Sequence, residues 1–263
     1  MEHFQFSPVS VLNDETMTHI YLIRHGQASF GAENYDKLSP LGQQQAAVVG
    51  DYFAKQGTNI AQVVHGKMSR QEETASILAK QSGFSGELIC HPGANEFDSD
   101  SLVKHYLPIL TKQSTEFCEM LENNGKWWAT GDSFELFFCA MVSLWQTDDN
   151  CPFESWNYFY ARCLSCLNDV ADISKQSEQK GITIIATSSG LISVVMQSIL
   201  NFSNSTFMDM NLTTNNASIS EIIWPTNKTE PEKRSLRKRN RLLSFNNITP
   251  LLLAQNSRLI TRK

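Results

Sequence analysis

The sequence lacks any long hydrophobic run, and this absence bears first on the class of protein. None of the apolar stretches in its 263 residues approaches the roughly 20 that a membrane-spanning helix needs. Its first sixteen residues carry neither a basic start nor a long apolar segment, so we expect no secretory signal. We therefore expect a cytoplasmic protein with no membrane partner.

The chain also lacks an excess of positive charge. Its 22 lysines and arginines are outnumbered by 27 aspartates and glutamates, which gives a formal net charge of −5. A chain of this charge has no general attraction to nucleic acid, so we expect no such partner. One basic run, at residues 233–241, is most simply a solvated loop, and binding to an acidic partner is the alternative.

Cysteines are few and poorly spaced for a metal. Cys163 and Cys166 form a single C-x-x-C pair, and the sequence holds no second pair and no H-x-x-x-H. A structural zinc site needs four ligands at such spacings. We therefore expect no metal and six reduced thiols.

What the sequence does contain is an alternation of short apolar runs with amphipathic stretches. Apolar content is 41%, enough for a packed core. The periodicity predicts strands at 18–23, 60–64, 87–91 and 181–187, helices at 41–56, 69–80 and 191–200, and two late strands at 218–224 and 241–245. A tight turn is expected at 188–190, just before the last of these helices.

A long middle region is helical in pattern and rich in aromatic residues, over residues 102–180. It is either a helical cap inserted over the sheet, at about 99–153, or a helical half of the same core. Residues 154–173 give its clearest helix. Residues 1–17 are expected to form a loose arm, and residues 18–263 a single domain.

The most informative stretch is IYLIRHG, residues 20–26. A buried strand that ends in Arg24 and His25 delivers a cation and an imidazole to the sheet edge, where ligands gather in open α/β sheets. Gly26 allows the backbone to turn sharply there. The hypothesis is a nucleophilic or phosphate-binding site at His25; the alternative is a strand end whose polar residues are solvated.

A second cation lies at the start of the next expected helix. Ser69 is a plausible N-cap, which places Arg70 in the first turn. A cation is unfavourable at a helix N-terminus unless it faces an anion that the helix end also binds. Arg70 is therefore either a solvated surface residue or part of an anion site. Glu96 follows the third strand in a short acidic loop.

This order of features resembles the histidine phosphatase superfamily, whose fold is that of phosphoglycerate mutase. The resemblance rests on strand–RHG–helix, then strand–turn–SRQEETA–helix, then Glu96, then a late strand–turn–helix, over residues 18–98 and 154–250. Glu154 with Arg162 is similar to the segment these proteins carry before the last core strand. The resemblance implies a three-layer α/β/α sandwich around a mostly parallel sheet, with a helical insert.

It also implies a reaction. His25 would be the nucleophile, Arg24 and Arg70 would hold the phosphate oxygens, and Glu96 would protonate the leaving oxygen and then help deprotonate water. The implied activity is a metal-independent phosphomonoesterase that forms a phosphohistidine and uses no cofactor. Its substrate would be a phosphorylated small molecule or a phosphoprotein. Residues 27–31 (QASFG) lack the S-x-x-N of the mutases, which favours a phosphatase.

The chain departs from the family at one position. These proteins carry a second histidine in an S-H-G turn after the last core strand, whereas residues 187–190 are TSSG and no histidine follows residue 105. Ser188 stands in that place and can bind a phosphate oxygen, but it carries no charge. The alternatives are a slow enzyme, a rearranged site in which His65 substitutes, or an impaired pseudo-phosphatase that binds phosphoesters or phosphoproteins.

Overall fold

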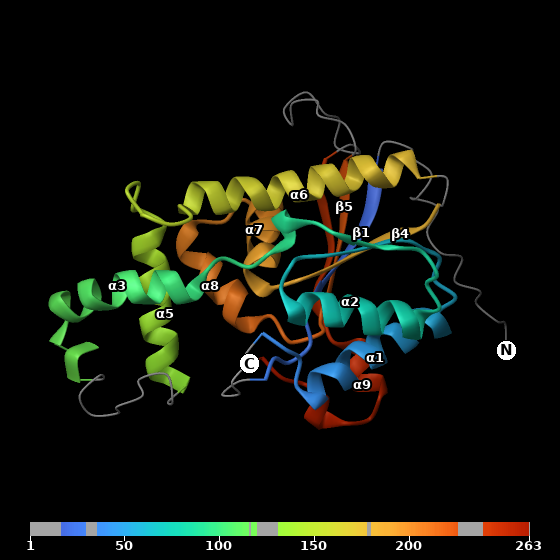
Figure 1. Ribbon diagram of the computed structural model, residues 1–263, viewed down its shortest axis with the longest axis horizontal. Coiled ribbons are helices and arrows are strands. Elements are labelled where there is room, and N and C mark those ends of the chain that lie inside the picture. Colours follow the sequence, from blue (N-terminus) through green and yellow to red (C-terminus); the bar gives the residue numbers. More distant parts are fainter. Residues whose placement is uncertain are drawn as a thin grey trace, which may run out of the picture.

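The computed structural model describes residues 17–29, 36–115, 117–119, 131–177, 180–225 and 239–262. These residues form a six-stranded sheet in the order β3-β2-β4-β1-β5-β6, with helices on both faces (Figure 1). The strands are β1 (Met17–Arg24), β2 (Ile60–His65), β3 (Leu88–Cys90), β4 (Ile182–Thr187), β5 (Ile219–Pro225) and β6 (Arg241–Asn247). Neighbouring strands from β3 to β1 pair in parallel, and β5 and β6 add antiparallel pairs at one edge. The predicted three-layer, mostly parallel fold is confirmed.

The two strands nearest the middle of the parallel part, β2 and β4, are buried along their whole length. Their sequences, IAQVVH and ITIIAT, are nearly continuous apolar runs, as expected for parallel strands that are covered on both faces. Register aligns the carboxyl ends of three strands. Arg24 of β1 lies opposite Thr187 of β4, and His65 of β2 lies opposite Ala186.

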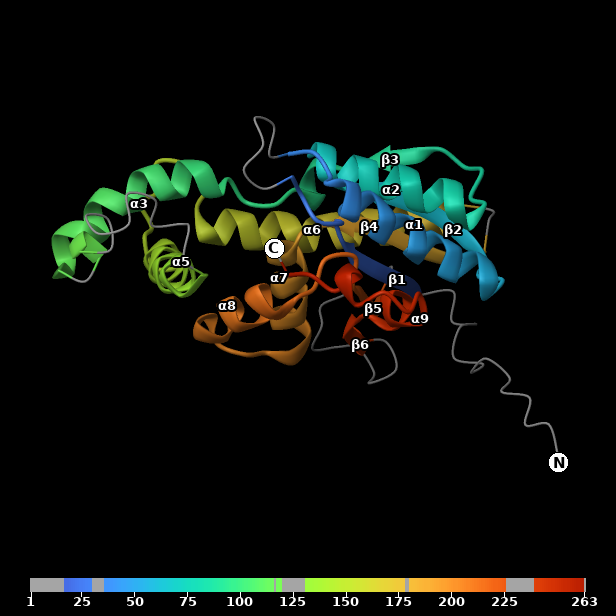
Figure 2. The ribbon, with the colours of Figure 1, turned by 90° about the horizontal axis from the view of Figure 1, so that it is seen from below.

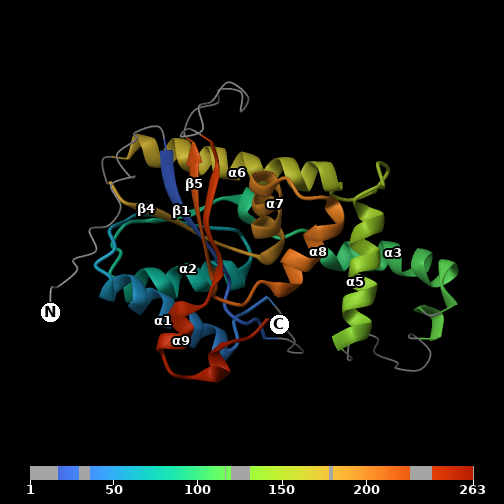
Figure 3. The same cartoon turned by 180° about the vertical axis from the view of Figure 1, so that it is seen from behind.

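The helices form two layers around this sheet. On one face lie α1 (Pro40–Lys55), α2 (Ser69–Ser82) and α9 (Thr249–Leu253), and on the other α6 (Trp156–Gln176) and α7 (Ser189–Leu200) (Figures 1 and 3). Successive residues of β1 point to opposite layers, with Ile23 in the core under α1 and α2, and Leu22 in the core under α6 and α7.

The helices of the middle region lie in two places. Helix α6 covers the sheet, whereas α3 (Ser99–Gln113) and α5 (Gly131–Trp145) extend beyond the end of the sheet (Figures 1 and 2). One buried cluster nevertheless continues from β1 through α6 to Trp145 of α5. The smaller elements are η2 (Pro92–Ala94), α8 (Asn204–Thr213) and η6 (Ser257–Leu259).

Two helix starts differ from the sequence-based expectation. Met68, not Ser69, is the N-cap of α2, and it makes no side-chain capping bond. The expected turn at 188–190 is shorter, because α7 already begins at Ser189 with Ser188 as its N-cap. The helix α8 was not predicted. The expected arm and most of the basic run lie outside the described residues.

Candidate functional site

The five residues singled out from the sequence come to the carboxyl edge of the parallel strands. Arg24 ends β1 and His25 follows it, Ser188 follows β4, and Arg70 lies in the first turn of α2. Glu96 follows η2 and reaches the N-terminus of α7. They come from segments up to 164 residues apart, and each is placed by a strand end or a helix end.

The imidazole of His25 is held in one tautomer by its two neighbours. Its Nδ1 lies 2.7 Å from the carbonyl oxygen of Gly26, which can only accept a hydrogen bond. Its Nε2 lies 3.2 Å from Nε of Arg70, which can only donate. The ring is therefore neutral, with the proton on Nδ1 and the lone pair of Nε2 facing Arg70.

Electrostatics favour the same neutral state. His25 is 6% exposed, and burial, followed by the charges of Arg70 and Arg24, lowers its pKa well below the usual value of 6.5. The hydrogen bond to Gly26 opposes this shift only in part. A neutral imidazole beside two guanidinium groups has the protonation state that a nucleophile requires.

Arg70 does face an anion at the helix N-terminus, and that anion belongs to the chain. Oδ1 of Asp36 accepts from NH1 of Arg70 at 2.6 Å, and Oδ2 accepts from the backbone N–H of Ser69 at 2.8 Å. The carboxylate thus binds the end of α2 and the guanidinium together, which leaves Nε of Arg70 directed at His25. Sequence reasoning missed Asp36, because nothing in residues 27–40 marks it.

Arg24 is fixed from the opposite side by backbone carbonyls. Its NH1 donates to the carbonyl of Thr214 and, at 3.0 Å, to that of Arg262. The segment that carries Arg262 is tied down by Gln45, whose amide donates to the carbonyl of Leu259 at 2.8 Å. The guanidinium therefore has a set position beside His25, and its supporting contacts come from distant parts of the chain.

Glu96 sits on the N-terminus of α7. Its carboxylate accepts the backbone N–H of Gly190 at 2.9 Å and that of Phe97 at 3.1 Å. Burial raises its pKa above 4.5, although these two N–H groups and the charges of Arg70 and Arg162 pull it the other way. A raised pKa keeps a carboxylic acid protonated to higher pH, which suits a proton donor.

Arg162 of α6 holds the loop that carries Glu96. It donates to the carbonyls of Gly93, Asn95 and Glu96 at 3.2, 2.8 and 3.2 Å, and its guanidinium pairs with both oxygens of Glu154. Three carbonyls on one fork fix the path of the loop. Arg162 therefore positions the carboxyl group of Glu96 through the backbone.

Ser188 is almost fully buried, at 1% exposed, and its Oγ accepts a hydrogen bond from the Gln71 side chain at 2.8 Å. His65 ends β2 on the far side of β4 and repeats the local geometry of His25, since its Nδ1 lies 2.7 Å from the carbonyl of Gly66. Within the described residues, the side-chain hydrogen bond of His65 is to Gly66, whereas His25 also has one to Arg70. Gln71 had no signal in the sequence.

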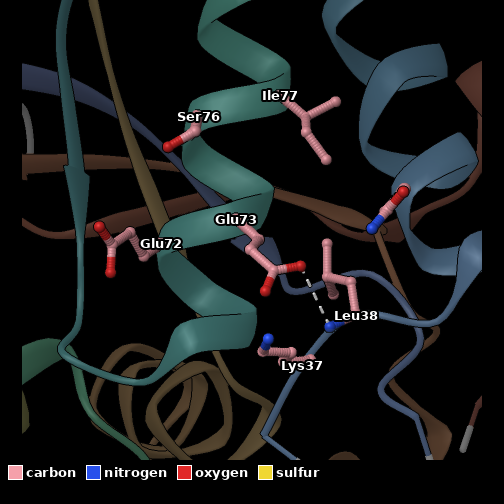
Figure 4. A pocket seen from close by; sticks show the side chains of 7 residues that line it. Lys37, Leu38, Glu72, Glu73, Ser76 and Ile77 are labelled. Carbon is pink, nitrogen blue, oxygen red and sulfur yellow. Dashed lines mark hydrogen bonds between the residues drawn. The ribbon is translucent and has the colours of Figure 1, made fainter.

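A hollow of about 490 Å³ lies along the outside of α2 and is lined by Lys37, Leu38, Gln43, Glu72, Glu73, Ser76 and Ile77 (Figure 4). Within it, the backbone N–H of Leu38 donates to Glu73 at 3.3 Å. It contains none of the five site residues. The hollow therefore does not overlap the group of residues at the strand edge.

In the part of the chain that the structure describes, no cluster of His, Cys, Asp or Glu has the arrangement of a metal site. Cys163 and Cys166 instead lie fully buried in the core, and burial raises the pKa of both thiols. Nor does any helix among the described residues combine the length and apolar character needed to cross a bilayer.

Similar proteins of known sequence share part of this chain. Mitochondrial serine/threonine-protein phosphatase PGAM5 of Xenopus laevis is 39% identical over 93 residues, which are 35% of this chain and 30% of that protein. Probable phosphoglycerate mutase GpmB of Enterobacter sp. (strain 638) is 28% identical over 113 residues, 41% of this chain and 51% of that protein. The chain thus matches about a third to a half of the length of these curated relatives.

Solved structures share the fold over nearly the whole chain. Phosphoglycerate mutase from Bacillus anthracis superposes with a TM-score of 0.59 at 15% identity, covering 92% of this chain and 98% of that one. A mycobacterial glucosyl-3-phosphoglycerate phosphatase gives 0.56 at 16% identity, covering 88% and 99%. The model of the histidine phosphatase superfamily (branch 1) matches residues 20–138 and 124–236. Because that match covers more than half of the sequence, the chain belongs to the histidine phosphatase superfamily.

Proposed function

We propose that the chain is a metal-independent phosphomonoesterase that works through a phosphohistidine on His25. The observation that carries this proposal is the pair of contacts at the ring, Nδ1 with Gly26 and Nε2 with Arg70. They leave a neutral imidazole whose lone pair points at a guanidinium. A phosphoryl group attracted by that guanidinium meets the nucleophile directly.

In the first step, Nε2 of His25 attacks phosphorus and the bond to the leaving oxygen breaks. Glu96 gives its proton to that oxygen, which its raised pKa allows. Arg24 and Arg70 bind the equatorial oxygens and offset their charge, so Arg70 leaves Nε2 when phosphate enters. Charge stabilisation by two positioned arginines is the main requirement of phosphoryl transfer.

In the second step, water attacks the phosphohistidine. Glu96, now a carboxylate, takes a proton from that water as the phosphorus–nitrogen bond breaks. Inorganic phosphate leaves, and His25 returns to the neutral ring with its proton on Nδ1. Ser188 donates a hydrogen bond to a phosphoryl oxygen in both steps.

The test is hydrolysis of p-nitrophenyl phosphate between acidic and neutral pH, without added metal, by the wild type and by His25→Ala. We expect turnover by the wild type alone, and quenching during turnover with alkaline denaturant should trap phosphate on the protein that later acid treatment releases. Equal rates for both proteins would refute the mechanism.

A second candidate function is binding of phosphoesters without turnover. The observation that favours it is Ser188, an uncharged group in the turn after β4. It predicts that orthovanadate raises the melting temperature by mass action although no hydrolysis occurs. The Arg70→Ala variant should then lose that shift.

The substrate class proposed here is a phosphorylated small molecule or a phosphoprotein. The relatives offer both, because one is named a protein phosphatase and another a sugar-phosphoglycerate phosphatase. Comparing release of phosphate from a phosphoserine peptide with release from free phosphoserine separates them. A cytoplasmic location is likewise a proposal, and fractionation of cells that express the chain tests it.

A further inference from the structure

Gln71 is a fully buried amide in the first turn of α2, at 0% exposed. Its Nε2 donates to Oγ of Ser188 at 2.8 Å and to the carbonyl oxygen of Ala94 at 3.2 Å. It thereby joins the N-terminal turn of α2 to the start of α7 and to the loop that leads to Glu96. Neither the sequence nor the proposed mechanism had assigned it a role.

The carbonyl of Ala94 fixes which way the amide faces. A carbonyl oxygen can only accept, so the amide atom beside it must be the nitrogen. The same nitrogen faces Ser188, whose Oγ is therefore the acceptor in that contact. The opposite end of the amide, Oε1, is buried and has no hydrogen-bond partner in the described residues. A buried amide that leaves its oxygen unpaired is unusual, and the donor end is the one in use.

This orientation determines what the hydroxyl of Ser188 can do. A hydroxyl that accepts from one side still has its own proton to donate. Among the described residues, no acceptor is paired with that proton, and Ser188 makes no capping bond to α7. Because the residue is 1% exposed, this donor meets a ligand that enters the site rather than bulk solvent.

The donor lies next to the nucleophile. Arg24 and Thr187 are partners in the β1–β4 register, so His25 and Ser188 each follow by one residue on neighbouring strands. The backbone N–H of His25 also donates to the carbonyl of Thr187 at 2.8 Å. Neighbouring strands are about 4.8 Å apart. The backbones of His25 and Ser188 therefore lie about one strand spacing apart, at the same edge of the sheet.

We infer that Gln71 is a positioning residue that turns the hydroxyl of Ser188 into a dedicated donor for a phosphoryl oxygen. Gln71 acts through Ser188, and the two together supply the hydrogen bond at the turn after β4. The inference rests on the proposed function of this site, since it assigns a ligand to the same pocket.

The experiment is a double-mutant cycle for orthophosphate binding, measured by titration calorimetry on the whole chain. The variants are Gln71→Met, which keeps size but removes the amide, Ser188→Ala, and the two combined. We expect each single variant to lose roughly 10- to 100-fold in affinity, as for one hydrogen bond to a charged group. The double variant should bind no more weakly than either single one, because both remove the same interaction.

The matched control is Gln62→Met. Gln62 is also buried, on β2, and its amide nitrogen has no partner in the described residues. This variant removes the same group from the core at a distance from the site, so phosphate affinity should stay at the wild-type value. Losses at Gln71 and Ser188 that simply multiply, or a Gln71→Met variant that binds like the wild type, would overturn the inference.

Two further measurements separate a loss of phosphate binding from a failure to fold and from a loss of catalysis. If Gln71→Met does not fold, the Ser188→Thr variant is measured in its place. Because threonine retains the hydroxyl, this variant should bind phosphate more tightly than Ser188→Ala. Equal affinities of the two variants would overturn the inference. Hydrolysis of p-nitrophenyl phosphate is measured on the same samples. Phosphate binding with no turnover by the wild type refutes the proposed function alone, whereas absence of phosphate binding by the wild type refutes the inference too.

Discussion

The carboxyl ends of β1 and β2 carry the same local structure and different surroundings. In each, a histidine that is 6% exposed is followed by glycine, and Nδ1 lies 2.7 Å from the glycine carbonyl. At β1, Nε2 faces Arg70 and a second arginine precedes the ring. At β2, the described residues give His65 no such contact. The local turn is thus the same at both histidines, and the arginines are what distinguish the surroundings of His25.

The largest effect should come from exchanging each histidine for alanine in turn. We expect His25→Ala to lower kcat/KM for p-nitrophenyl phosphate by on the order of 10⁴-fold or more, because it removes the nucleophile. His65→Ala should change it by less than about tenfold, because the hydrogen bond that the described residues show for that ring is to Gly66 and not to an arginine. Steady-state kinetics at one pH give both values. Equal losses of kcat/KM in the two variants would show that His65 is a second imidazole of the site. The difference in surroundings between His25 and His65 would then not determine which of them acts.

The second effect concerns Glu96. It belongs to the β1 end of the comparison, because it interacts electrostatically with Arg70, the residue that faces His25. Glu96→Gln keeps an acceptor for Gly190 but has no proton to give. We expect kcat/KM, which reports the first step, to fall by about 10²–10⁴-fold on an alkyl phosphate and by much less on p-nitrophenyl phosphate, whose leaving group needs no acid. Equal losses on the two substrates would show that Glu96 is not the proton donor to the leaving group.

The same variant tests the pH dependence. The pKa of Glu96 is raised, so the acid form persists to higher pH than for an ordinary carboxyl group, and the wild-type rate on alkyl phosphate falls only above that pKa. The pKa of His25 is lowered, so the neutral ring persists below pH 6.5 and the acid limb lies well below that value. Glu96→Gln should remove the fall at high pH and leave the acid limb in place.

Much of this site could be predicted from the sequence, because its parts are local. The strand before Arg24 and His25, and the helix that begins near Arg70, follow from short patterns. The start of α7 could not be predicted in this way. A backbone N–H at its N-terminus donates to the carboxylate of Glu96, which lies 94 residues earlier in the chain. For the same reason Ser189 and Gly190 are helical rather than a turn.

Asp36 and Gln71 show the other limit of the sequence. Asp36 lies in a segment with no periodic signal or motif, and Gln71 lies in SRQEETA, whose pattern predicts a helix but gives this residue no role. Each acquires its role only when another segment reaches it. Asp36 meets Arg70 across 34 positions, and Gln71 meets Ser188 across 117. A pattern within a window of about 20 residues cannot contain such pairs.

The third prediction removes one of the charges that distinguish the two histidines. Arg70→Gln should raise the pKa of His25, because the imidazolium loses a repelling neighbour, and the acid limb of the rate profile should move up in pH. We expect kcat/KM to fall by about 10²–10³-fold with the loss of phosphate binding. NMR titration of the histidine rings gives the pKa directly.

The smallest effect is expected at the opposite end of β1, where a third histidine has the reverse environment. His19 lies 2.5 Å from Oε1 of Glu221, and this hydrogen bond, with a smaller contribution from Tyr21, lowers the pKa of Glu221. A carboxyl group with a lowered folded-state pKa stabilises the fold above its unfolded pKa, near 4.5, and loses that contribution as pH falls through the folded value. Glu221→Gln should therefore lower the free energy of unfolding at pH 7 by less than about 1 kcal/mol, as for a partly exposed pair. Urea denaturation of both proteins should show the difference shrinking below pH 4. A difference that persists there would mean that the glutamine destabilises the fold through packing and not through loss of charge. The carboxylate beside His19 would then not be the counterpart of the arginines beside His25.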